Sequence, residues 1–105
     1  MKYVLVYYGG AMGATPAAQA EALNAWDVWS KNLGKAVVDL GNPFSGKVKS
    51  VAPDGTIGDG PIARIASGYS ILEAATIDEA AKMAASCPVL KGGGQIAVYE
   101  TFNAM

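Results

Sequence analysis

The chain has 105 residues, of which 51% are apolar and 16% charged, and its 8 basic residues nearly balance its 9 acidic ones. This length predicts one domain over residues 1–105, the lack of a basic patch disfavours nucleic-acid binding, and the apolar runs are too short to span a membrane. With no histidine and one cysteine, a Ser-His-Asp triad is excluded, and we expect no transition metal and no cofactor.

The first predicted element is a strand over Lys2–Tyr8, which is apolar at both parities and therefore typical of a strand covered on both faces. No cleavable apolar segment precedes it, so we expect no signal peptide and a cytoplasmic location. Thr15 and Pro16 then predict a helix N-terminus. The helix is expected over residues 16–33, with one apolar stripe formed by Ala22, Trp26, Trp29 and Leu33.

The middle of the chain is expected to hold a second strand over Lys35–Leu40, which Gly41–Pro43 ends. The next segment is rich in Gly, Pro, Asp and Ser. Within it, Lys47–Ala52 and Thr56–Ile57 can pair as a small hairpin across Pro53–Gly55.

The last third predicts strand, helix and strand. The strand covers Gly68–Ala75, and Thr76 with Glu79 forms a capping box that opens a helix reaching about Ser86. Gln95–Phe102 is the final strand.

Together these elements predict an α+β domain of ferredoxin-like βαββαβ layout, with two helices on one face of an antiparallel sheet. The helices can cover only one face of that sheet, whereas the strands are apolar on both. A second copy of the chain is the simplest cover for the other face, so we expect a homodimer formed sheet to sheet.

Several segments resemble the YCII-related family, also called the DGPF-type domain. They are Met1–Tyr3, Asp59–Ile62, Gly68–Ala74, Asp78–Ala80 and Pro88. The resemblance implies a dimeric α/β barrel, in which two sheets face each other, and a small-molecule cleft. Some members look like enzymes that use a His-Asp pair, and this sequence contains no histidine.

Strand alternation predicts where a ligand would lie. It places one set of side chains under the helices, namely Val4, Val6, Leu72, Ala74, Ile96 and Val98. The opposite face then carries phenols and two carboxylates: Tyr3, Tyr7, Asp39, Tyr69, Glu73 and Tyr99. Phenols suit a pocket for an aromatic ligand, and a carboxylate buried among them could act as acid or base. We predict a ligand site formed by Tyr7, Asp39, Asp59, Tyr69, Glu73 and Tyr99.

Simpler interpretations stay open for each of these residues. The tyrosines could simply fill a dimer interface, where Tyr is enriched. Asp59 could serve only the turn before Pro61. Trp26 and Trp29 suit a core stripe, and Cys87, which has no histidine partner, suits a small buried apolar residue.

Two functions therefore remain. One is a small-molecule binder, with a lyase or isomerase type of activity as a further possibility, whose site is a cleft on the sheet. The other is a non-catalytic interaction or regulatory module that acts through its dimer surface.

Overall fold

The computed structural model describes residues 1–11 and 13–104. It contains eight helices and strands, together with 3₁₀ turns over Gly34–Ala36 and Pro88–Gly92. In chain order they are β1 (Lys2–Tyr8), α1 (Pro16–Leu33), β2 (Val37–Asp39), β3 (Lys49–Val51), β4 (Ile57–Asp59), β5 (Gly68–Glu73), α2 (Ile77–Ala84) and β6 (Gln95–Glu100).

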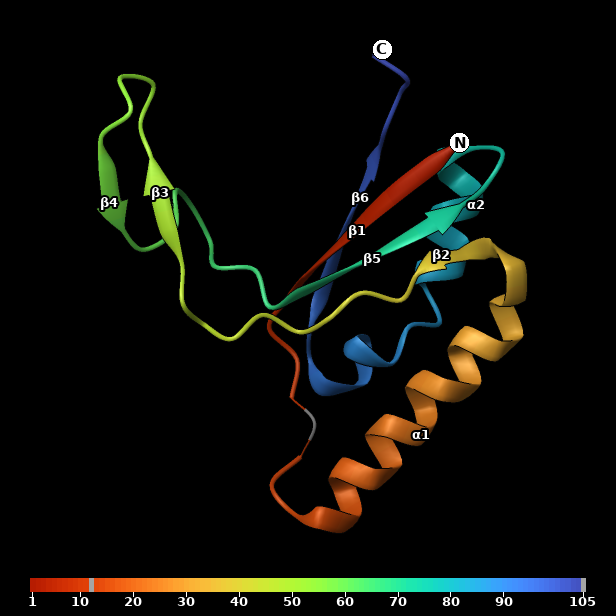
Figure 1. The fold of residues 1–105 in the computed structure, drawn as a ribbon. Coiled ribbons are helices and arrows are strands. Elements are labelled where there is room, and N and C mark those ends of the chain that lie inside the picture. The colour runs from red at the N-terminus through yellow and green to blue at the C-terminus, as the bar shows by residue number, and fades with distance from the viewer. Residues whose placement is uncertain (12, 105) are drawn as a thin grey trace.

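Four strands form one sheet in the order β2-β5-β1-β6, and every neighbouring pair is antiparallel (Figure 1). The strands β3 and β4 form a separate hairpin between β2 and β5. This arrangement confirms the predicted α+β, ferredoxin-like βαββαβ fold. Among the described helices, none is both long and apolar enough to cross a bilayer.

Both α-helices begin directly after the predicted N-cap residues. The Thr15 side chain accepts a hydrogen bond from the Ala18 amide at 3.1 Å, and the Thr76 side chain accepts one from the Glu79 amide at 3.1 Å. The predicted strand at Lys35–Leu40 is shorter than expected because Gly34–Ala36 forms a 3₁₀ turn before β2 begins.

The core lies between the sheet and the helices. On β5 and β6 the predicted faces are confirmed, since Leu72 is fully buried and Ile96 and Val98 pack against the core. On β1 the prediction is wrong. Tyr3, Leu5 and Tyr7 are the buried residues, and they lie opposite Leu72, Ser70 and Gly68 of β5.

The physical reason for the β1 error is that both parities of the strand are apolar, so alternation alone cannot choose between them. Packing against the helices determines which parity of β1 faces the core. α2 presents the small buried residues Ala80 and Ala84 to the sheet. Large side chains on β1 fill the space that these alanines leave. The Tyr7 ring also packs edge to face on Trp26, with a distance of 5.4 Å between the ring centroids.

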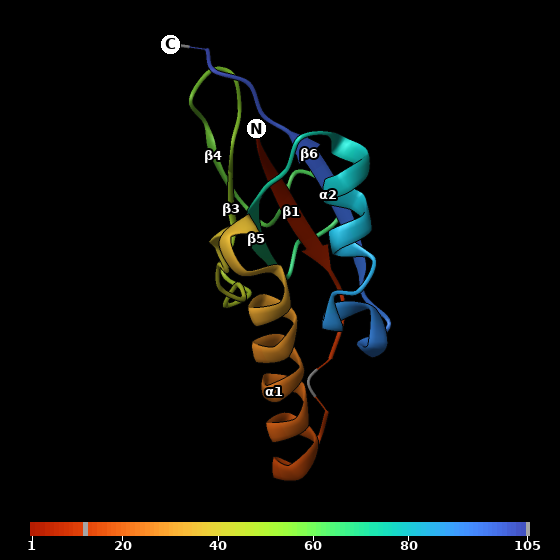
Figure 2. The same cartoon turned by 90° about the vertical axis from the view of Figure 1, so that its right-hand side faces the viewer.

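The molecule is flat, with extents of 44 × 37 × 18 Å. Its radius of gyration is 15.2 Å, compared with about 13 Å for a compact domain of this length. Figures 1 and 2 show why: the first turns of α1 extend beyond the sheet, and the β3–β4 hairpin stands away from the body.

Candidate functional site

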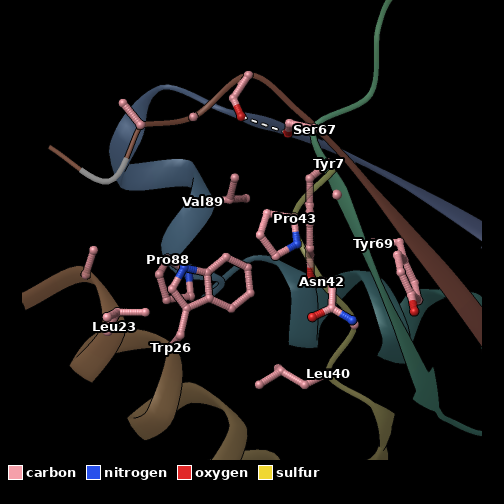
Figure 3. Close-up of a pocket in the computed structure, with 16 residues that line it drawn as sticks. Tyr7, Leu23, Trp26, Leu40, Asn42, Pro43, Ser67, Tyr69, Pro88 and Val89 are labelled. Carbon is pink, nitrogen blue, oxygen red and sulfur yellow. Dashed lines mark hydrogen bonds between the residues drawn. The ribbon is translucent and has the colours of Figure 1, made fainter. Parts of the chain in front are cut away.

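A cavity of about 320 Å³ opens between α1 and the end of the sheet (Figure 3). Four short segments and one side of α1 form its walls. The segments are the end of β1 with Gly9–Ala11, the chain after β2 at Leu40–Pro43, the start of β5 at Ser67–Tyr69, and the turn at Pro88–Val89.

Glycines stand where the wall segments of this cavity come into close contact. Gly41 has a φ of +79°, and a Cβ there would lie 1.7 Å from the Tyr69 carbonyl oxygen. Gly10 has a φ of +85°, and a Cβ there would lie 2.8 Å from a Val89 methyl group. Glycine is therefore required where two segments cross at the edge of the cavity.

Aromatic and aliphatic side chains supply most of the lining. In Figure 3, Trp26 and Leu23 approach from α1, and Val89 approaches from the turn above them. The Trp26 ring is held edge to face by Tyr7 and, at 5.6 Å, by Trp29. Trp29 is in turn fixed by a hydrogen bond from its Nε1 to the Met83 carbonyl at 3.0 Å. The indole of Trp26 is thus a preorganised wall.

Two of the side-chain hydroxyls that line the cavity, those of Tyr7 and Ser67, already form hydrogen bonds within the chain. The Tyr7 hydroxyl donates to Ser70 Oγ at 2.7 Å, and Ser70 Oγ donates to the Leu40 carbonyl. Ser67 Oγ donates to the Gly9 carbonyl at 2.9 Å. Burial raises the pKa of the Tyr7 phenol, so this group stays protonated at neutral pH.

Asn42 is the exception among the polar groups. Its side-chain amide lies near Tyr7, Pro43 and Leu40 in Figure 3. Asn42 is exposed at the rim, and its side chain makes no hydrogen bond to another described group. An amide offers both a donor and an acceptor, so Asn42 can orient a ligand that carries an oxygen.

The cavity is also electrically neutral. No carboxylate, ammonium or guanidinium side chain is among the described residues that line it. Cys87 lies in the core beside Tyr7, and burial raises the pKa of its thiol. It is the small buried residue that the sequence predicted, and not an activated nucleophile.

The residues predicted as one site lie in several places. Tyr7 and Tyr69 line the cavity, but Tyr7 does so from the helix side of the sheet, which corrects its predicted face. The Tyr69 hydroxyl donates to Asp39 Oδ2 at 3.3 Å, so Asp39 lies with Tyr69 on the open face, the sheet face opposite the helices. Tyr3 is buried under the helices and also departs from its predicted face.

The other three residues lie away from the cavity. Glu73 accepts a hydrogen bond from the Met1 amino group at 2.7 Å. Asp59 pairs with Lys49 across the β3–β4 hairpin at 2.5 Å. Tyr99, at the far end of β6, is 54% exposed. The structure therefore does not gather the six residues into one site.

The sequence did not predict Asn42 as a cavity residue, and it predicted Trp26 as a core residue only, whereas both line the cavity. Asn42 stood in a Gly41–Pro43 segment that was interpreted as a strand end, and its position in a cavity wall depends on the later segment Ser67–Tyr69. Trp26 had a usable signal, because it lies on the same helix stripe as Ala22, which also lines the cavity.

Within the described part of the chain, no group of three or more His, Cys, Asp or Glu side chains is placed to hold a metal ion. The expectation of no metal and no cofactor stays a prediction.

No family model matches the chain, and no curated protein matches it. Among solved structures, the chain is similar to 5-chloro-2-hydroxyhydroquinone dehydrochlorinase (TftG) from Burkholderia phenoliruptrix AC1100, in complex with 2,5-dihydroxybenzoquinone. The TM-score is 0.58 at 18% identity, over 99% of this chain and 96% of that one.

The likeness is one of fold. It agrees with the layout that the YCII-related resemblance implied, and at this identity it carries no residue roles. Membership of that family stays a prediction.

Proposed function

We propose that the chain binds a small, uncharged, flat molecule in the cavity between α1 and the sheet. The observation that supports this most directly is a cavity of about 320 Å³ with apolar walls and one uncommitted amide, that of Asn42. Small-molecule sites have volumes from about 300 Å³ upward and combine apolar walls with a few polar groups that orient the ligand.

The shape and charge of the walls narrow the class of ligand. The fixed indole of Trp26 offers a flat face for an aromatic or quinone-like ring. A charged ligand would lose its hydration without gaining an ionic partner, because no charged side chain is among the described residues of the wall. The TftG structure holds a ring of the same general kind, 2,5-dihydroxybenzoquinone.

The residues at the cavity favour binding over catalysis. A lyase or isomerase reaction needs a group that accepts a proton near neutral pH. The Tyr7 phenol is protonated and donates to Ser70, and the carboxylates of Asp39 and Glu73 lie outside the cavity lining. We therefore propose a binding function, with catalysis as the lesser alternative.

The test compares two probes that share one ring, the neutral methyl 4-hydroxybenzoate and the anionic 4-hydroxybenzoate, which lacks the ester methyl group. We expect the ester to quench Trp26 fluorescence in a saturable way and the carboxylate to bind at least about tenfold more weakly. Asn42→Leu should weaken ester binding about fivefold because the orienting hydrogen bond is lost. Asn24→Leu is the matched control, since Asn24 lies exposed on α1 outside the cavity.

Three results would contradict this proposal. They are no saturable quenching by the ester at millimolar concentration, equal affinity for the two probes, or unchanged ester binding by Asn42→Leu with native circular dichroism.

The open face of the sheet supports the second candidate, an interaction module that acts through its dimer surface. Val4 and Val6 of β1 and Ile71 of β5 are only half-buried on this face, and Tyr99 is exposed. We propose that two copies pack sheet to sheet over this face, as the sequence predicted. Such a contact would cover apolar side chains that the helices cannot reach.

A further inference from the structure

The β3–β4 hairpin projects from the rest of the fold and is attached to it at its root. Figure 1 shows it at the upper left, apart from the four-stranded sheet, and Figure 2 places it on the side of the sheet opposite α2. In the described chain, β3 and β4 pair only with each other. The body holds the hairpin at its root, where the Phe44 amide donates to the Ser67 carbonyl and the Phe44 ring stacks on Tyr69.

The hairpin exposes apolar side chains on one face. Val51 and Ile57 lie directly opposite each other in the register, and they are 61% and 66% exposed. Lys49 and Asp59 form the next pair on the same face and neutralise each other. An isolated two-stranded hairpin is at best marginally stable in water, so this face needs a surface to pack on.

The exposed surface of the whole chain is also larger than that of a typical monomer of its mass. The chain exposes 7188 Å², whereas a folded monomer of its mass exposes about 5,500 Å². The excess of about 1,700 Å² per chain falls within the range that obligate homodimers bury per protomer.

The chemistry of the hairpin favours a second copy of this chain over an unrelated partner. Its face presents an apolar pair and a self-neutralised ion pair, so it offers no charge for a charged partner to recognise. The same chain carries the uncovered apolar open face, on the side to which the hairpin projects. The net charge of −1 opposes self-association only weakly.

We propose that the β3–β4 hairpin is an arm that packs through Val51 and Ile57 against a second copy of the chain. The two copies then hold each other reciprocally, so every arm contact occurs twice per dimer. This goes beyond the sheet-to-sheet contact proposed above, because it makes the arm a required part of the interface.

The test is the double variant Val51→Thr/Ile57→Thr, which keeps β-branched side chains and hence strand propensity while adding hydroxyl groups. We expect the dissociation constant of the dimer, measured by sedimentation equilibrium, to rise at least about tenfold, because both arms lose apolar contacts. Val28→Thr is the matched control. Val28 is 47% exposed on α1, so its substitution should leave the constant unchanged.

A second measurement on the wild-type chain does not depend on the folding of the variant. Chains labelled with ¹⁴N and ¹⁵N are mixed, allowed to exchange, and treated with a lysine-specific cross-linker. We expect mixed-isotope cross-links from Lys47 or Lys49 of the arm. A monomeric wild-type chain, an unchanged dimer constant in a folded double variant, or arm cross-links confined to single chains would overturn the proposal.

Discussion

Tyr7 connects the core and the cavity through one side chain. Its ring contacts Trp26 edge to face, and its hydroxyl donates a hydrogen bond to Ser70 Oγ. Ser70 Oγ in turn donates a hydrogen bond to the Leu40 carbonyl. Ser70 is fully buried, so this short network satisfies polar groups that would otherwise be costly in the core. The same network joins β1, β5 and the segment after β2, and so it positions the wall that carries Asn42.

Tyr7→Phe should lower the free energy of unfolding at neutral pH by about 1 kcal/mol, because Ser70 Oγ loses a donor. Urea unfolding measures this difference. Tyr99→Phe is the control, since Tyr99 is largely exposed and its hydroxyl bonds to no other described residue; it should change stability by less than about 0.5 kcal/mol.

The same variant has a predicted pH dependence. Because burial raises the pKa of Tyr7 in the folded chain, its phenol ionises first in the unfolded chain, at a pH of about 10. The wild type therefore loses stability as the pH rises above about 10, and Tyr7→Phe does not lose this contribution. The gap between the two proteins should narrow at alkaline pH; a gap that widens there would contradict the argument.

At the scale of elements, the two helices are capped alike but supported differently. α2 lies on the sheet with Ala80 and Ala84 buried, whereas Trp29 is the one residue of α1 that is buried. The first turns of α1 project past the sheet, where Leu23 and Trp26 form one side of the cavity (Figures 1 and 3). α1 can therefore fray at its start without unfolding the core.

This difference predicts unequal effects of removing the two caps. Thr76→Ala should destabilise the whole chain by about 1 kcal/mol in urea unfolding, because α2 cannot fray without exposing the core. Thr15→Ala should instead speed amide hydrogen exchange in the first turn of α1, with less than about 0.5 kcal/mol change in global stability. Equal global effects would show that α1 is fixed along its whole length.

At the scale of the whole molecule, the chain exposes more surface than is typical of a folded monomer of its mass. The helices cover one side of the sheet and leave the open face uncovered, while the projecting hairpin and the start of α1 enlarge the radius of gyration. Stability should thus depend on association.

We expect the thermal unfolding temperature to rise by several degrees when the protein concentration increases about a hundredfold, because mass action favours the folded dimer. Differential scanning calorimetry across that range measures the change. Lysozyme, a monomer, provides a reference under the same conditions, and an unfolding temperature independent of concentration would contradict a dimeric folded state.

Much of the fold was determined by local signals in the sequence. Thr15–Pro16 and the Thr76–Glu79 box define helix starts because capping depends on a few neighbouring atoms. Glycine and proline mark the ends of strands, and the order of elements then leaves few ways to build an antiparallel sheet with two helices. The alternation on β6 was equally readable, since Ile96 and Val98 make one parity more apolar than the other. On β5 the charged Glu73 marked the parity that faces away from the helices.

Only the tertiary structure decided the face of β1 and the place of the cavity. The strand Lys2–Tyr8 is apolar at both parities, so its orientation depends on how much space Ala80 and Ala84 leave on the helix side. The cavity depends on α1 and four segments distant in sequence, two of which meet where Gly41 lets the chain pass against Tyr69. Such contacts are set by packing between elements, which a local pattern of residues does not encode.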